Sequence, residues 1–391
     1  MDSDFDAIFV RMTNSPLSKK AHRLAVAAFF FVVGLCFASW ASRIPDIKQK
    51  LHLSDAGLGG VLFALPVGSM ISMPFSGWLV ARHGSKKIVT IAAICYPLML
   101  VMIGFANSVL QLVPIVFLFG FLGNLCNISI NTQAVGVEAL YGRSIMASFH
   151  GTWSLAGFTG AAIGTLMVSG HIKPLYHFSL VCAGLIVMVL AARNFSLEKD
   201  ATHPDQPLFA RPDSLLLKLG LIAFSCMVCE GTMFDWSGVY FQKVVHAPLS
   251  LTTLGYAAFM STMAGGRFIG DRVVNHFGKK KVLQVSGFVI ASGLLLAVIL
   301  PYIVTATIGF LLVGMGVSSV VPLVYSSAGK SKTLSPGVAL TAVSTIGFLG
   351  FLLGPPLIGF IAQAFSLRIS FTLIAVLGFC TTLLASQVKW E

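Results

Sequence analysis

Residues 21–42 read AHRLAVAAFFFVVGLCFASWAS, an almost unbroken run of apolar and small residues. A helix of about 20 such residues crosses a hydrocarbon core of roughly 30 Å. Similar runs recur along the whole chain, near residues 55–80, 87–107, 111–138, 145–170, 176–194, 215–242, 251–270, 282–301, 303–328, 337–363 and 369–388. The sequence therefore predicts an all-α polytopic membrane protein with 12 transmembrane helices.

The overall composition agrees with a membrane location. Of the 391 residues, 56% are hydrophobic and only 10% are charged. A soluble domain carries about 25% charged residues, because its surface faces water. The seven cysteines all fall within predicted spans, so no extracellular pair is available for a disulfide framework. Collagen-like, disordered and disulfide-rich secreted classes are excluded.

The distribution of positive charge predicts the orientation of the chain. With the N-terminus placed in the cytoplasm, only six of the 26 Lys and Arg residues fall on the opposite side: Arg43, Lys48, Lys50, Lys173, Lys243 and Arg368. This bias follows the positive-inside rule and explains the net charge of +12 without nucleic acid. We therefore expect a multi-pass protein of the plasma or bacterial inner membrane, with both termini in the cytoplasm. Residues 1–20 read as a cytoplasmic tail rather than a cleaved signal peptide.

Weak self-similarity relates the two halves of the chain at an offset of 190 to 196 residues. The matching sets are Trp40 with Trp236, the turn at 84–87 with that at 278–281, and Gly157, Gly160 and Gly164 with Gly347, Gly350 and Gly354. Between the halves, residues 195–214 read FSLEKDATHPDQPLFARPDS, the longest polar stretch inside the chain. We predict two six-helix bundles, over residues 21–194 and 215–391, joined by this cytoplasmic loop.

Twelve helices in two halves, with a glycine and basic turn after the second helix of each half, resemble the major facilitator superfamily. The family's turn has the form G-x3-D-R-x2-G-[RK]-[RK]. The first half matches it at Gly77, Arg82, Lys86 and Lys87, with Gly84 one residue before the second motif glycine, and the second half carries Asp271 and Arg272 before Gly278. The resemblance implies that this turn helps to hold the cytoplasmic side shut. Gly77, Arg82, Gly84, Asp271 and Arg272 are therefore predicted gating residues, whereas Ala81 replaces the Asp in the first half and weakens the latch there.

A finer resemblance is to a fucose-permease-like branch of uncharacterised members. It rests on Arg43-Ile-Pro45 and on the segments at 131–138, 146–154 and 230–237. The proton-carrying Asp of fucose permease falls on Ala41 here, and its Glu on the fourth helix falls on Asn127. If this protein is proton-coupled, it uses other carboxylates.

Two acidic residues in the seventh span are the predicted proton-coupling groups. Glu230 lies near its middle, and Asp235 lies five residues nearer its outer end. Intramembrane acids are costly and usually functional, although each could instead form a structural hydrogen bond. At about 100° per residue the two side chains differ by roughly 140° in azimuth, so they do not form one paired site. His150, on the fifth span, is a further candidate for relaying protons, with a purely structural role as the alternative.

Uncharged polar and aromatic side chains are the predicted substrate-binding groups. Asn124, Asn127 and Asn131 form one stripe on the fourth span, which continues to Glu138, a predicted gating residue. Amides suit hydroxyl-rich solutes, although they also join helices in membranes. The other candidates are Trp40, Trp153, Ser154, Trp236 and Ser237, whose indole rings could stack on a sugar or lie in interfacial belts. Arg43 could gate the outer end as a counter-charge for Asp235, or lie in the headgroup region.

Signals for enzymatic activity, cofactor binding and metal binding are absent from the sequence, because it contains no HExxH, GxSxG or metal-spaced Cys/His set. The prediction is a monomeric secondary transporter that works by alternating access, with a proton and a small polar solute such as a sugar as its partners. One alternative is proton-coupled efflux of drugs or amphipathic metabolites. Another is a non-transporting membrane receptor on the same fold.

Overall fold

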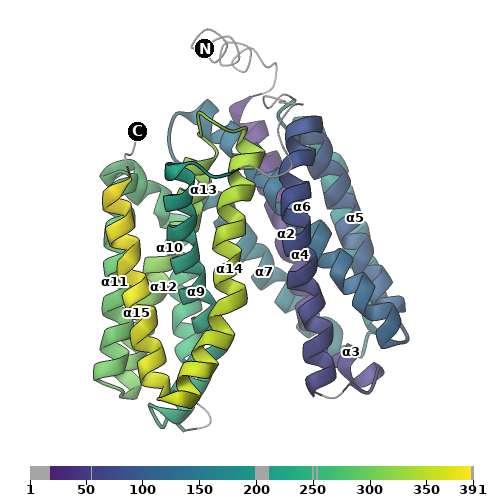
Figure 1. Cartoon of the computed structure of the whole chain (residues 1–391). Helices are drawn as coiled ribbons and strands as arrows, with labels where there is room; N and C mark the ends of the chain where they lie inside the picture. The colour runs from purple at the N-terminus through teal and green to yellow at the C-terminus, as the bar shows by residue number, and fades with distance from the viewer. Residues whose placement is uncertain (1–17, 54, 199–210, 249–250, 252–253, 389–391) are drawn as a thin grey trace. The chain divides into compact units, whose positions relative to one another are not determined.

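The computed structural model describes residues 18–53, 55–198, 211–248, 251 and 254–388, and these contain long helices and no β-strand (Figure 1). The first half contains α2 (Lys19–Ser42), α3 (Ile44–Lys50), α4 (Asp55–His83), α5 (Ser85–Phe105), α6 (Val109–Tyr141), α7 (Met146–Ser169), α8 (Pro174–Ala192) and the short 3-10 helix η1 (Arg193–Phe195). The second half contains α9 (Ser214–Lys243), α10 (Leu254–Phe277), α11 (Lys279–Ile299), α12 (Ile303–Val317), α13 (Val320–Ala328), α14 (Pro336–Ala364) and α15 (Leu367–Gln387).

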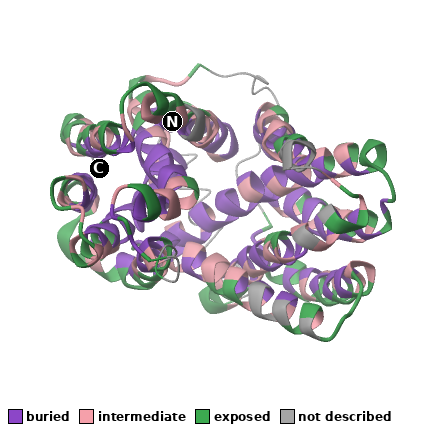
Figure 2. Ribbon diagram, turned by 90° about the horizontal axis from the view of Figure 1, so that it is seen from below, coloured by how far each residue is buried: buried purple, intermediate pink, exposed green. Residues whose placement is uncertain are grey.

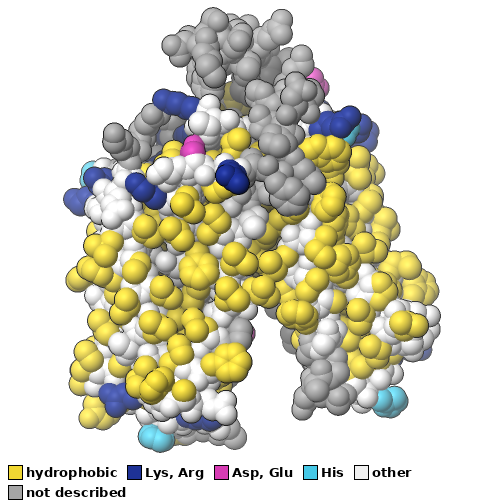
Figure 3. Space-filling model, viewed as in Figure 1, with side chains coloured by type: hydrophobic (Ala, Val, Ile, Leu, Met, Phe, Trp, Pro, Cys, Tyr) yellow, Lys and Arg dark blue, Asp and Glu magenta, His cyan; other side chains and the backbone are white. Residues whose placement is uncertain are grey.

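The predicted all-α membrane fold is confirmed. Each of the 12 predicted spans corresponds to a long helix, with α12 and α13 together forming one span. Within the described residues, ten helices are long and apolar enough to cross a membrane, and α7 and α10 correspond to the other two predicted spans. Hydrophobic side chains cover the sides of the helices, and Lys and Arg lie near their ends (Figure 3).

Three local features differ from the prediction. The short helix α3 follows α2 directly, and α10 continues to Phe277, seven residues beyond its predicted end. The predicted span 303–328 is interrupted at Ser318 and Ser319, between α12 and α13. Pro322 explains the interruption, because a proline in a helix removes an N–H group and its ring clashes with the carbonyl four residues earlier, here that of Ser318.

The helices form two compact units. Unit 1 comprises the described parts of Met1–Arg143, Thr152–Ala210 and Lys332–Thr341, and unit 2 those of Ser144–Gly151, Arg211–Ser331 and Ala342–Glu391. Each unit thus includes the first turns of a helix that continues in the other, α7 in unit 2 and α14 in unit 1. The predicted boundaries at residues 20, 194 and 214 stay predictions, and residues 1–17 and 199–210 lie outside the described residues.

Within each unit the helices bury their shared faces and expose the others (Figure 2). In unit 1, α6 packs along both α4 and α5; in unit 2, α11 packs along α12 and α15. Small residues permit close approach at specific points. A Cβ atom on Gly160 would lie 2.7 Å from that of Ala38, whereas one on Gly157 would meet nothing within 4 Å. Gly160 therefore has a packing role against α2 that Gly157 lacks.

Candidate functional site

Polar side chains of α9 and α10 form a buried group in unit 2. Glu230 lies one helical turn after Cys226 on α9 and is 5% exposed, and the Cys226 thiol donates to Glu230 Oε1 at 3.7 Å. Arg267 of α10 is 7% exposed and interacts electrostatically with the Glu230 carboxyl group. Burying a charge is costly unless an opposite charge and hydrogen bonds compensate for it. The burial of Glu230 and that of Arg267 therefore stabilise each other.

His150 and Tyr325 extend this buried group. His150, in the second turn of α7, is within electrostatic range of Arg267. Its ring lies edge-on to that of Tyr325 on α13, with 6.2 Å between the ring centroids. The Tyr325 hydroxyl accepts a hydrogen bond of 2.8 Å from Ser344 Oγ on α14. We refer to Cys226, Glu230, Arg267, His150 and Tyr325 as the polar cluster.

Three members of the polar cluster, Cys226, Arg267 and Tyr325, are not among the predicted site residues. Arg267 carries a usable signal in the sequence, because it is a charged residue inside the predicted span 251–270. Tyr325 carries none, since nothing in the order of residues indicates that a tyrosine on α13 lies beside a histidine on α7.

The remaining candidates on α9 lie outside the polar cluster. Asp235 is exposed whereas Glu230 is buried, in agreement with their separation around the helix. Trp236 packs against Gly359 of α14, and its indole Nε1 is buried with no hydrogen-bond partner among the described residues. Ser237 Oγ is likewise buried, and the described part of the chain offers it no partner.

The asparagine stripe of α6 lies in unit 1, and its side chains form hydrogen bonds with other groups of that unit. Asn124 Nδ2 donates to Ser76 Oγ of α4 at 3.4 Å. Asn131 Nδ2 donates to the backbone oxygen of Asn127 at 2.8 Å and to its Oδ1 at 3.0 Å. Asn124, Asn131 and Glu138 are buried, and Asn127 is half-buried. Asn127 is therefore the most accessible member of the stripe.

The aromatic candidates of unit 1 differ in accessibility. Trp40 is 2% exposed and packs against Phe119 of α6, with 6.3 Å between the ring centroids, so it belongs to the core of the unit. Trp153 and Ser154 of α7 are half-buried. They belong to unit 1, whereas His150, one turn earlier on the same helix, belongs to unit 2.

Arg43 lies at the centre of a bonded group at the end of α2. It is 1% exposed, so its guanidinium group is enclosed by protein. Its Nη1 pairs with the Asp46 carboxylate of α3 at 3.3 Å, and the suggested role of Arg43 as a counter-charge for Asp235 stays a prediction. Its Nε donates to His177 Nδ1 at 3.1 Å and its Nη2 to the Ile172 carbonyl at 2.7 Å. Arg43 thereby joins α2, α3 and the start of α8.

Asp271 of α10 binds the beginning of α7 in unit 2. Its carboxylate accepts hydrogen bonds from the backbone N–H of Ala147 at 3.0 Å and of Ser148 at 2.8 Å, and from Ser148 Oγ. One turn later, Asn275 Oδ1 accepts from the Ser144 N–H at 2.9 Å, and its Nδ2 donates to the Ser144 carbonyl at 3.1 Å. These contacts satisfy N–H groups that the first turn of a helix leaves free, and the carboxylate meets the positive end of the helix dipole. We call Asp271, Asn275 and residues 144–148 the α7 clamp.

The repeat-related contact in unit 1 has no such acid. At an offset of 190 residues, Ala81 corresponds to Asp271, and Gly337 near the start of α14 corresponds to Ala147. Ala81 is buried and has no acceptor to offer. α14 packs onto α4 by close approach instead, since a Cβ on Gly77 would lie 2.5 Å from Thr341 Oγ1.

The other predicted gating residues lie at the ends of helices. The Arg82 guanidinium lies 5.3 Å from the Trp78 ring centroid, and Arg272 is exposed. Gly84 precedes α5 with φ of 82°, a left-handed conformation that glycine adopts without strain. No group of three or more His, Cys, Asp or Glu side chains that could hold a metal ion occurs among the described residues.

Comparison with known proteins establishes the family. The family model described as Major Facilitator Superfamily matches residues 24–335. The chain belongs to the Major Facilitator Superfamily. An uncharacterised MFS-type transporter of Yersinia pestis is 34% identical over 348 residues, which cover 89% of this chain and 91% of that protein.

Solved structures of the superfamily share the fold. The crystal structure of the human organic anion transporter MFSD10 has a TM-score of 0.79 at 13% identity, and covers 94% of this chain and all of that chain. The Escherichia coli fucose:proton symporter FucP has a TM-score of 0.75 at 12% identity, covering 94% of this chain and 98% of that chain. The protein is a multi-pass membrane transporter of the superfamily and not an enzyme.

Proposed function

We propose that this transporter couples the uptake of a small polar solute, such as a sugar or a sugar derivative, to protons by alternating access. The observation that carries the proposal is Glu230, which is buried in the polar cluster with Arg267 and the Cys226 thiol as neighbours. The cost of burying this carboxyl group can be offset in two ways. The group can be ionised and paired with Arg267, or it can be protonated and neutral, without needing that pair. Exchange between them would link proton binding to a change in packing between α9 and α10.

Accessible or unsatisfied polar groups in each unit support a polar solute. Asn127 of unit 1 is only half-buried. In unit 2, Trp236 Nε1 and Ser237 Oγ have no hydrogen-bond partner among the described residues. Buried polar atoms without partners are costly, and a hydroxyl-rich solute could satisfy them.

Proton-coupled export of amphipathic compounds is the second candidate. It is favoured by an aromatic group on α9, α10 and α14, in which Phe234 stacks on Phe351 with 6.1 Å between centroids and meets Phe259 edge-on at 5.7 Å. Such a group would suit a ligand with a large apolar surface.

We further propose that the α7 clamp acts in gating. Asp271 holds the first turn of a helix whose later turns belong to unit 1. A helix that bridges two units in this way is suited to report a rearrangement of one unit to the other, and breaking the clamp would lower the cost of that rearrangement. Because the turn containing Asp271 is predicted to lie on the cytoplasmic side, release of the clamp would accompany opening to the cytoplasm.

The test is uptake of a panel of labelled sugars into proteoliposomes under an imposed pH gradient, with Glu230→Gln as the variant. Glu198→Gln is the matched control, because the Glu198 side chain is 84% exposed and pairs only loosely with Lys86, at 3.5 Å. We expect gradient-driven accumulation in the native protein and the control, and its loss in Glu230→Gln.

Each other outcome has a definite meaning. Equal uptake by Glu230→Gln and by the native protein, with or without a gradient, would make Glu230 structural and the protein a facilitator. If no sugar moves but the vesicles extrude dyes, the export candidate replaces the uptake proposal. Binding without any flux would favour a receptor.

A further inference from the structure

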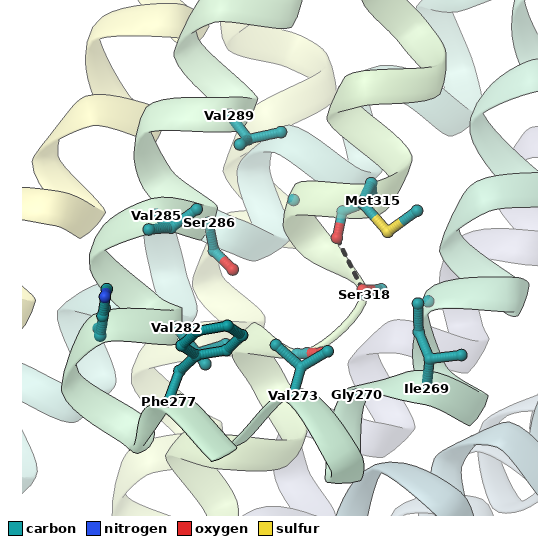
Figure 4. Close-up of a pocket in the computed structure, with 14 residues that line it drawn as sticks. Ile269, Gly270, Val273, Phe277, Val282, Val285, Ser286, Val289, Met315 and Ser318 are labelled. Carbon is teal, nitrogen blue, oxygen red and sulfur yellow. Dashed lines mark hydrogen bonds between the residues drawn. The ribbon is translucent and has the colours of Figure 1, made fainter. Parts of the chain in front are cut away.

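A cavity of about 290 Å³ lies in unit 2, outside the polar cluster, between α10, α11 and the junction of α12 with α13 (Figure 4). The interruption of the helix at Ser318 and Ser319 forms part of its wall. A Cβ on Gly270 would lie 2.6 Å from Ser319 Oγ, so α10 approaches this junction closely on one side and leaves the space open on the other.

The lining of the cavity suits an alkyl chain. Most of the lining side chains are aliphatic, sulfur-containing or aromatic, including Val273, Phe277, Val282, Val285, Val289 and Met315. Ser318 Oγ donates to the Met315 carbonyl at 2.7 Å, as Figure 4 shows, so this hydroxyl is already satisfied. Ser286 and Ser319 add two hydroxyl groups to an otherwise apolar lining. A hydrocarbon chain would therefore contact mainly apolar side chains on entering.

The cavity opens at the surface of the unit. Phe277 and Val285 on its rim are each 51% exposed, and Ile269 and Met315 are 45% and 43% exposed. In a chain that spans a membrane, exposed apolar side chains of this kind face lipid. An acyl chain from the bilayer can therefore reach the cavity without crossing water.

One end of the cavity is strongly basic. α10 and α11 are joined by Gly278, and residues 279–281 at the start of α11 are all lysines. Lys281 itself lines the cavity, with its Nζ 5.3 Å from the Phe277 ring centroid, and Lys280 beside it is exposed. The first turn of α11 contains no acidic residue, and the nearby Asp271 is bonded to α7. This end presents positive charge to an anionic headgroup.

We propose that the cavity is a binding site for one anionic glycerophospholipid, such as phosphatidylglycerol. One acyl chain occupies the space between α10, α11 and α12, and the headgroup phosphate is held by Lys280 and Lys281. The proposal depends on an apolar cavity that ends at a basic cluster, and it is independent of the transported solute. Charge complementarity selects an anionic lipid over a zwitterionic one, with about fivefold in affinity for each lysine near the phosphate.

The test is native mass spectrometry of the full chain in detergent, titrated with phosphatidylglycerol or phosphatidylcholine of identical acyl chains. The headgroup variant is Lys280→Gln with Lys281→Gln, and its matched control is Lys87→Gln at the repeat-related start of α5. The cavity variant is Val289→Trp, and Val285→Trp on the exposed rim serves if Val289→Trp lowers the thermal stability of the protein. Leu98→Trp, an exposed position on α5, controls for adding an indole to a lipid-facing surface.

We expect the native protein to retain phosphatidylglycerol preferentially, and the headgroup variant to bind it more than tenfold more weakly, with its phosphatidylcholine binding unchanged. The cavity variant should weaken binding of both lipids, and the two control variants should match the native protein. Equal binding of the two lipids by the native protein would overturn the proposal. So would unchanged phosphatidylglycerol binding in either the headgroup or the cavity variant.

Discussion

The α7 clamp allows a quantitative prediction for Asp271→Ala. The substitution removes the acceptor of two backbone N–H groups, those of Ala147 and Ser148, and of the Ser148 hydroxyl. A hydrogen bond to a charged group contributes about 1.5–3 kcal/mol, and a carboxylate at a helix N-terminus gains up to about 2 kcal/mol from the dipole. Because Asp271 is 7% exposed, little of this is replaced by water. We estimate a loss of about 3 kcal/mol from the two backbone bonds together.

The measurement is hydrogen exchange of residues 144–151 in the purified protein. A loss of about 3 kcal/mol corresponds to an increase of roughly 150-fold in the local opening equilibrium, and hence in the exchange rate of these amides. Asp271→Asn keeps one acceptor oxygen without the charge and should give a smaller increase, of about tenfold. Arg272→Gln alters the adjacent exposed residue and should give no change.

The interpretation of the clamp would be refuted by one result in particular. If Asp271→Ala leaves exchange in 144–151 at the native rate while the protein remains folded, the carboxylate does not hold the start of α7. A uniform increase across α9 to α15 would be a different result, since it would indicate general destabilisation of unit 2 rather than release of one helix end.

Three further predictions concern unit 1. Gly77→Ala should lower the stability by about 1–3 kcal/mol in thermal unfolding, because its Cβ would lie 2.5 Å from Thr341 Oγ1, whereas Gly157→Ala, with open space around it, should be neutral. Ala81→Asp should slow hydrogen exchange at the start of α14 and reduce cysteine accessibility from the cytoplasmic side, and unchanged accessibility would contradict a weakened latch in the native protein. Asn127→Ala should raise the KM for a transported polar solute and leave the response to the pH gradient intact; a KM equal to that of the native protein would assign Asn127 to the structural bond with Asn131.

The arrangement of spans follows from the sequence because each span must satisfy its own backbone hydrogen bonds in lipid. Helix boundaries follow to within a few residues where a glycine separates two apolar runs, as at Gly84 between the spans predicted at 55–80 and 87–107. The end of α10 lies seven residues beyond the prediction, because the helix continues through the charged residue Asp271. Its charge is in fact compensated by the start of α7, 124 residues earlier in the chain.

The contacts within the candidate site are harder to predict from the sequence, because the site residues come from different helices. Glu230 stands out as an acid within a span, but its surroundings depend on how α9, α10 and α13 pack. Arg43 shows the same limitation: the sequence identifies a charge at the end of a span, and only the packing assigns Asp46 as its partner. Local rules find candidate residues, and long-range packing decides what each of them contacts.

The two halves share a repeat but carry different chemistry at equivalent positions. At the offset that relates Trp40 to Trp236, Glu230 corresponds to Gly34. A Cβ on Gly34 would lie 2.5 Å from the Trp153 carbonyl, so the first half uses this position for close packing of α2 on α7. Ala81 and Asp271 differ in the same sense. Glu230 and Asp271 thus place buried carboxyl groups in unit 2 at positions where unit 1 has Gly34 and Ala81. If the two units have different tasks, substitutions that alter coupling should be found in α9 and α10, and those that alter solute affinity alone should be found in α6.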